Sequence, residues 1–138
     1  MHSPDIINGV TFELDCEFDL TDVAKDSKNI VLMNDYGGFL FYPLGNGIYE
    51  SHQHFLKEGR GKFVFDSAKK AVNFMFKKTD CLCLIAKIPE KYKHASVVAI
   101  KTGFYYVDSI KSPYHKDWIL RNYKLDFKTW RTKSWAEQ

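Results

Sequence analysis

Apolar residues recur along the chain with two different periods, which predicts a mixture of strands and helices. Short apolar runs and alternations with a period of two, rich in Val, Ile, Phe and Tyr, indicate strands. These segments are residues 10–14, 30–33, 39–42, 48–55, 81–88, 104–110 and 117–125. Gly, Asn and Asp residues at 34–38 and 43–47 predict tight turns, so the strands around them should form antiparallel hairpins.

A helical period replaces the alternation over residues 62–78 and again over residues 91–102. In the first of these segments one apolar stripe is formed by Val64, Ala68, Ala71, Val72 and Met75. Gly103 follows the second segment, at a position where a left-handed residue commonly ends a helix. A short helix is also expected at 20–25, whereas Trp130 and Trp135 lie in a segment with the composition of a polar tail.

The order of these elements predicts the fold class. Hairpin strands come first, followed by a helix, a buried strand, a second helix and two closing strands. This order is typical of an α/β (α+β) fold in which a single mixed, mostly antiparallel sheet is flanked by helices. One strand is expected to be brought into the sheet by a helical crossover. With 138 residues the chain is expected to form one domain over 1–138.

The composition indicates a globular protein and excludes several classes. A net charge of only +3 does not favour nucleic-acid binding. The cysteines, Cys16, Cys81 and Cys83, are odd in number and lack the Cys-x-x-Cys spacing, which argues against a disulfide framework or a zinc site. His52 and His54 have no partner of diagnostic metal-ligand spacing. No apolar run approaches the roughly 20 residues that cross a bilayer, so we expect a soluble, cytoplasmic protein.

Candidate chemistry gathers where the strand 48–55 leads into the first long helix. Side chains alternate across a strand, so Glu50, His52 and His54 share one face. The sequence Gly-Arg-Gly-Lys at 59–62 follows and opens the helix. Free backbone N–H groups at a helix N-terminus, together with cations, can hold a phosphate. An anion site beside a proton-handling face suggests a transferase that uses a phosphorylated cofactor. The simpler alternatives are a solvated basic turn and an exposed polar sheet face.

This arrangement resembles the GNAT acetyltransferase superfamily, and within it a compact group of proteins often encoded by phages. Residues 50–62 match the family's strand and the Arg-Gly-Lys start of its pyrophosphate-binding turn. Residues 68–76 match the following helix, 82–89 the next strand, and 95–104 the helix that closes on Gly103-Phe104. The resemblance covers about 29–125, and four elements in the same order are more specific than the turn alone.

The resemblance implies that acetyl-CoA lies in a V-shaped opening between the strand ending near Leu56 and the strand beginning near Leu82. The residues expected to contact acetyl-CoA are Phe55, Leu56, Gly59, Arg60, Gly61, Lys62, Phe63, Val64 and Tyr92. Glu50 or His52 would deprotonate the amine that accepts the acetyl group, and Tyr106 or its neighbour Tyr105 would protonate the leaving thiolate.

Two functions from different classes follow. The first is an N-acyltransferase in which an amine of a protein or small molecule attacks the thioester directly. The second is a catalytically inactive GNAT-shaped binding or inhibitor protein, encoded by a phage and acting on a host or virion protein. Phe63, Phe65, Tyr92 and Ala99 motivate the second, because family members carry smaller residues, an Asn and a catalytic Tyr at these places. A monomer and a homodimer are both compatible with the sequence. A third reading, a nucleic-acid accessory protein, rests only on its lysines and aromatic residues.

Overall fold

The computed structural model of the chain describes residues 9–13, 29–34, 37–55 and 62–136, and for 9–13, 34, 54–55 and 62–63 it describes the backbone alone. The expected helix at 20–25 and the Gly-Arg-Gly turn at 59–61 lie outside the described residues. The helices and strands are β1 (Gly9–Glu13), β2 (Asn29–Asn34), β3 (Gly37–Gly45), β4 (Ile48–Phe55), α1 (Lys62–Lys78), β5 (Cys83–Pro89), α2 (Lys93–Lys101), β6 (Tyr105–Lys111), β7 (Ile119–Asp126) and α3 (Phe127–Trp130).

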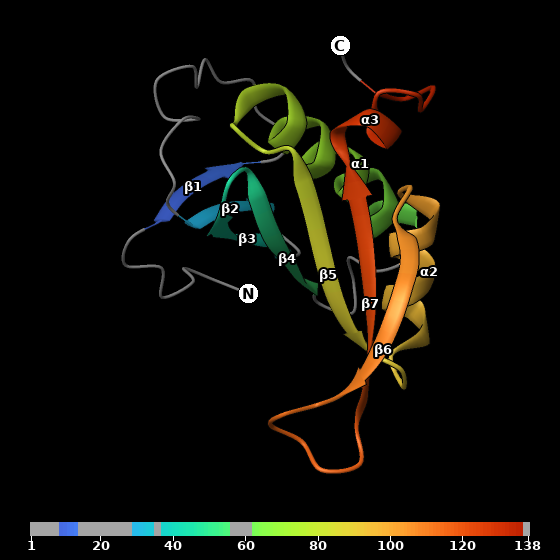
Figure 1. The fold of residues 1–138 in the computed structure, drawn as a ribbon. Coiled ribbons are helices and arrows are strands. Elements are labelled where there is room, and N and C mark those ends of the chain that lie inside the picture. Colours follow the sequence, from blue (N-terminus) through green and yellow to red (C-terminus); the bar gives the residue numbers. More distant parts are fainter. Residues whose placement is uncertain (1–8, 14–28, 35–36, 56–61, 137–138) are drawn as a thin grey trace.

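Within the described residues, seven strands form one sheet in the order β1-β2-β3-β4-β5-β7-β6 (Figure 1). The β2–β3, β3–β4, β5–β7 and β6–β7 pairs are antiparallel, as the predicted hairpins and closing strands require. The β4–β5 pair is parallel and is connected through α1, which confirms the predicted helical crossover. A second parallel pair, β1–β2, was not predicted from the sequence. The fold is therefore the mixed, mostly antiparallel α+β fold that the pattern predicts.

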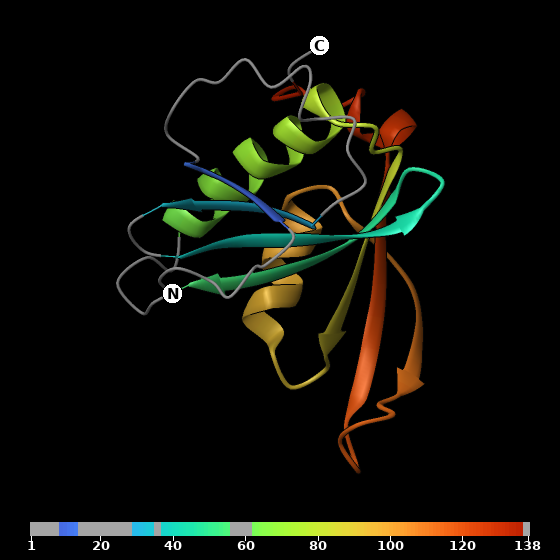
Figure 2. The ribbon, with the colours of Figure 1, turned by 90° about the vertical axis from the view of Figure 1, so that its left-hand side faces the viewer.

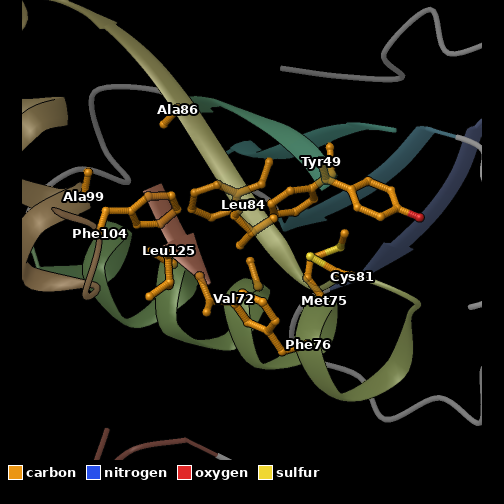
Figure 3. Packing of buried hydrophobic residues seen from close by; sticks show 14 of the residues in the cluster. Tyr49, Val72, Met75, Phe76, Cys81, Leu84, Ala86, Ala99, Phe104 and Leu125 are labelled. Atoms are coloured by element: carbon orange, nitrogen blue, oxygen red, sulfur yellow. The ribbon is translucent and has the colours of Figure 1, made fainter. Parts of the chain in front are cut away.

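The hydrophobic core lies between this sheet and the helices α1 and α2. The predicted apolar stripe of α1 is buried, with Met75 fully inaccessible to solvent, and it packs against Leu84 and Leu125 from the sheet (Figure 3). Helix α2 contributes Ala99 and is followed by Gly103, whose φ of 105° is the left-handed conformation expected after a helix. No described helix combines the length and the apolar composition needed to span a bilayer.

The structure of the segment that follows β7 differs from the polar tail predicted from the sequence. Trp130 was expected in a polar tail, but it lies in α3 and is only 2% exposed. Its ring stacks on Phe76 at a centroid distance of 5.2 Å, and its Nε1 donates a hydrogen bond to Asn73 Oδ1 at 2.9 Å. α3 is capped at its start by Asp126, whose carboxylate accepts from the N–H of Thr129 at 2.7 Å. The prediction was wrong because the residues next to Trp130 in sequence are polar, although this short helix covers the core.

Candidate functional site

The strands β4 and β5 separate after a short paired stretch. Their parallel register contains only three pairs, from Ile48 with Cys83 to Glu50 with Ile85. Beyond this stretch the Ser51 hydroxyl donates to the Ile85 carbonyl at 3.2 Å, and the rest of each strand has no ladder partner in the other. Figure 2 shows the two strands running apart. This separation agrees with the V-shaped opening implied by the resemblance, and it leaves backbone N–H and C=O groups available to a ligand.

An apolar cavity of about 70 Å³ lies beneath the separation, between the sheet and the two long helices. Its walls come from β3, β4, α1, β5, α2 and the start of β6, and include Ala86, Ala99 and Phe104. Ser51, His52 and Gln53 of β4 border it at the point where β4 leaves β5. A space of this size holds on the order of a few water-sized groups, which is comparable to an acetyl group and the atoms next to it.

Glu50 and His52 form a hydrogen-bonded pair on the other face of β4. His52 Nε2 lies 2.7 Å from Glu50 Oε2, and the second carboxylate oxygen lies 3.4 Å from Lys87 Nζ of β5. The Glu50 side chain is 18% exposed, whereas that of His52 is 45% exposed, and its ring meets Tyr42 edge-on at 5.3 Å. The sequence predicted that Glu50 and His52 share a face. It did not identify Lys87 or Tyr42 as neighbours, because these contacts depend on strand register.

The electrostatics of this pair distinguish the two side chains. Glu50 Oε2 lies beside His52 Nε2 and Glu50 Oε1 beside Lys87 Nζ, so both carboxylate oxygens have partners that orient the group. A neutral imidazole that donates through Nε2 has its lone pair on Nδ1, where it can accept a proton. Of the two residues, His52 alone borders the apolar cavity. Its ring lies on the face of β4 opposite the cavity, so the arrangement places a proton acceptor beside the point where β4 leaves β5, with Glu50 orienting the imidazole.

Tyr106 is not brought to this pair. It lies on β6 at the edge of the sheet, and both β5 and β7 intervene between it and β4. Its hydroxyl is 2.7 Å from Ser109 Oγ. The neighbouring Tyr105 donates to Asp126 Oδ2 at 3.1 Å, and desolvation together with this bond raises the pKa of Tyr105.

The predicted cofactor residues are described only in part. Leu56, Gly59, Arg60 and Gly61 lie outside the described residues, and Phe55, Lys62 and Phe63 are described by their backbones alone. Helix α1 begins at Lys62, directly after the predicted turn.

Two further members of the predicted cofactor set have described side chains. Val64 is buried in the core, so a contact with a ligand would come from its backbone. Tyr92 precedes α2 without capping it by a side-chain hydrogen bond, and its ring meets Trp118 edge-on at 6.1 Å.

The cysteines with described positions are poor nucleophiles. Cys81 is 2% exposed and Cys83 is 8% exposed, and burial raises the pKa of both thiols. Cys81 precedes β5, not within a strand as predicted, but its buried, structural character agrees with the sequence analysis. Among the described residues no cluster of His, Cys, Asp and Glu could hold a metal ion.

Comparison with known proteins identifies the fold. No protein-family model matches the chain, and no curated protein sequence matches it. A chimera of the spermidine N-acetyltransferase SpeG from Vibrio cholerae and hSSAT aligns with a TM-score of 0.66 over 72% of this chain and 64% of that chain, at 11% identity. An acetyltransferase of the GNAT family from Bacillus anthracis aligns with a TM-score of 0.60, over 66% of this chain and 58% of that chain, at 18% identity.

A third structure is RimL, the ribosomal L7/L12 alpha-N-protein acetyltransferase in complex with coenzyme A. It aligns with a TM-score of 0.62 over 68% of this chain and 56% of that chain, at 12% identity. The chain thus spans less than two thirds of the length of each of these three structures. At identities of 11–18% the likeness shows the fold alone. The chain has the fold of the GNAT acetyltransferases.

Proposed function

We propose that this protein is an N-acetyltransferase that moves an acetyl group from acetyl-CoA to an amine. The observation that carries the proposal is the separation of β4 from β5 over an apolar cavity, with the His52–Glu50 pair on the opposite face of β4 where the two strands begin to separate. A polar, ordered pair beside an opening that leads to an apolar pocket is a typical arrangement for a reaction centre. The solved structures that share the fold are acetyltransferases, and one of them contains coenzyme A.

The described residues fit acetyl-CoA in two ways. The unpaired backbone N–H and C=O groups of β4 and β5 can form hydrogen bonds with the amides of its pantetheine arm, a narrow chain that fits between two separating strands. The N-terminus of α1, at Lys62, comes directly after the turn predicted at 59–61 and carries no acidic residue in its first turn, so it favours a diphosphate. When bound, acetyl-CoA supplies an activated thioester carbonyl.

We assign the role of base to His52 and the role of positioning residue to Glu50. The acceptor arrives as an ammonium ion and has no lone pair until it loses a proton, which His52 Nδ1 takes. The nitrogen then attacks the thioester carbonyl and the carbon–sulfur bond breaks. The attacking nitrogen, cationic after the attack, loses its second proton to solvent, which leaves the acetyl group on a neutral amide. Glu50 stabilises the imidazolium that forms, because its carboxylate is 2.7 Å from Nε2.

The leaving thiolate does not need Tyr106 in this scheme. A thiol has a pKa of about 8.5, so a thiolate is a stable leaving group near neutral pH and can take its proton from water. β5 and β7 lie between Tyr106 and the His52–Glu50 pair. Many members of the GNAT family carry a catalytic Tyr at the position of Ala99. Ala99 lines the cavity and has no proton to donate.

Calorimetry with acetyl-CoA and a thiol-release assay with a panel of amines test the proposal. The panel comprises spermidine, a lysine-containing peptide and a peptide with a free N-terminus. We expect saturable binding of acetyl-CoA and release of thiol with at least one amine. Lys78→Gln removes one positive charge at the end of α1 that is far from the predicted diphosphate site, so this variant should bind acetyl-CoA as tightly as the unmodified protein. Protein that binds no acetyl-CoA and releases no thiol with any amine contradicts the proposal.

A second candidate is a GNAT-shaped binding protein without catalytic activity, encoded by a phage and directed at a host or virion protein. Ala99 and the small volume of the cavity favour it. It predicts folded protein with no thiol release, and biological activity that survives Glu50→Ala. The acetyltransferase predicts that the same variant loses activity while it stays folded.

A further inference from the structure

A second cavity, of about 500 Å³, lies between α2 and β7, and the proposed acetyl transfer does not use it. Its helical wall is formed by Lys93, Ser96, Val97 and Ile100, which share one face of α2. The opposite wall comes from Arg121 and Tyr123 of β7, and Glu90 lies at the rim. The volume is within the range of small-molecule sites in proteins, roughly 300–1,000 Å³.

Two residues that line this cavity each carry a buried hydroxyl group with no hydrogen-bond partner among the described residues. They are Ser96 Oγ and Tyr123 Oη, and their residues are 7% and 1% exposed. A buried polar atom without a partner costs about 1–3 kcal/mol, so such atoms are rare in folded proteins and call for an explanation. Two of them in one cavity, one from the helix and one from the sheet, indicate that a ligand supplies the missing acceptor.

The guanidinium of Arg121 lies over an aromatic ring. Its guanidinium carbon lies 4.9 Å from the centroid of the Tyr106 ring. A guanidinium that stacks on a ring keeps its N–H groups, which lie in its own plane, available for a carboxylate. The Tyr106 ring is in turn positioned by its hydrogen bond with Ser109 and by an edge contact with Tyr123 at 6.0 Å.

A β-bulge makes this arrangement possible. The register of β6 against β7 shifts between Tyr106 and Asp108, so Val107 has no partner in β7. The shift places Tyr106 and Ser109, three residues apart, opposite Tyr123 and Arg121 on one face. Regular alternation would place them on opposite faces.

We propose that the cavity between α2 and β7 binds a small carboxylate that has an apolar body. The carboxylate is held by Arg121 and by the hydroxyls of Ser96 and Tyr123. Lys93 adds a second cation, and together the two cations outweigh Glu90. The apolar body lies along Val97 and Ile100, which are 45% and 56% exposed and form the outer part of the helical wall.

This site is separate from the proposed acetyl-transfer site. The two cavities share no lining residue, although both are bounded by α2. Ala95, Val98 and Ala99 face the first cavity, whereas Ser96, Val97 and Ile100 face the second. The inference therefore does not rest on the proposed function.

The test is a titration of the full chain with 3-phenylpropionate, followed by NMR of the backbone amides of α2 and β7. The uncharged 3-phenylpropanamide has the same shape and serves as the ligand control. We expect saturable shifts centred on Ser96, Val97 and Arg121, and at least tenfold weaker binding of the amide. Arg121→Gln and Tyr123→Phe should each weaken binding of the acid by about tenfold, as expected for loss of a hydrogen bond to a charged group. Lys101→Gln, on α2 but outside the cavity, should change it by less than about twofold.

Several results would overturn the inference. These are equal binding of the acid and the amide, unchanged binding in Tyr123→Phe, or no shift with either compound. Inorganic phosphate that binds as strongly as the acid would also overturn it, because the apolar wall would then contribute nothing. A thermal unfolding scan provides an independent readout. Tyr123→Phe without ligand should keep or raise Tm, because it removes an unpaired buried hydroxyl. A lower Tm would mean that the hydroxyl already has a partner in the protein.

Discussion

Removal of either member of the His52–Glu50 pair should reduce acetyl transfer to different extents. His52→Gln removes the proposed base but keeps a polar side chain of similar length. Loss of a general base typically costs 10²–10⁴ in rate, which corresponds to about 3–5 kcal/mol in the activation free energy. We expect kcat/KM to fall within that range. The affinity for acetyl-CoA should stay within about threefold, since no contact proposed for the cofactor comes from the imidazole.

Glu50→Gln should have a smaller effect. The amide oxygen can still accept the hydrogen bond from His52 Nε2, but it no longer stabilises the imidazolium. A hydrogen bond to a charged group contributes about 1–1.5 kcal/mol more than a neutral one, so we expect kcat/KM to fall by about five- to tenfold. Lys87→Gln is the matched control. Its ammonium is 3.4 Å from Glu50 and its side chain is 44% exposed, and such surface pairs contribute about 0.2–1 kcal/mol. The effect should be below about fivefold.

The assay is the release of coenzyme A thiol under steady-state conditions, with circular dichroism and Tm to verify that each variant is folded. His52→Ala in the presence of added imidazole is a further check, because the side chain is 45% exposed and leaves room for the free base. The expected order of loss is His52→Gln, then Glu50→Gln, then Lys87→Gln. A larger loss in Glu50→Gln than in His52→Gln, together with no rescue by imidazole, would refute the assignment and make the carboxylate the base.

Three further predictions concern the cavity and the stability of the fold. The larger side chain of Ala86→Leu would enter the cavity of about 70 Å³. Its burial stabilises the fold by up to about 2 kcal/mol, and overpacking destabilises the fold by about 1–3 kcal/mol, so Tm should change little. Calorimetry should show acetyl-CoA binding that is weaker by at least about tenfold. Asp126→Ala should lower the free energy of unfolding by about 1 kcal/mol. The Thr129 N–H lowers the pKa of Asp126, so this difference is complete above the ordinary value of 3.8 and disappears in denaturant titrations as pH falls through the lower folded value. Trp130→Phe removes the hydrogen bond to Asn73 and part of a buried ring, and chemical denaturation should detect a loss of about 2 kcal/mol.

Contradiction of these three would take different forms. Undiminished binding of acetyl-CoA in Ala86→Leu would mean that the cofactor does not enter the cavity. A stability difference in Asp126→Ala that persists unchanged in strong acid would mean that the carboxylate charge is not what caps α3. An unchanged free energy of unfolding in Trp130→Phe would mean that α3 contributes little to the stability of the core.

Strands and helices were largely determined by local sequence. The bounds predicted for β4 and α1, 48–55 and 62–78, coincide with those of the structure. Both elements combine a regular apolar period with Gly-rich segments at their ends, and these signals depend only on neighbours along the chain. The same period-two rule placed Glu50 and His52 on one face. Gly103, two residues after the last residue of α2, has the left-handed conformation that the sequence predicted for the end of this helix.

Tertiary structure determined which side chains of different strands and helices contact one another. Insertion of β7 between β5 and β6 moves Tyr106 away from β4, and no local pattern reports strand order. Register brings Lys87 to Glu50 and the bulge at Val107 brings Tyr106 to Arg121, again across strands that are distant in sequence. Trp130 is buried because α1 offers it a ring and a hydrogen-bond acceptor, although its own neighbours are polar. Periodicity is a property of consecutive residues and can be read from them, whereas contacts between elements depend on how the whole chain packs.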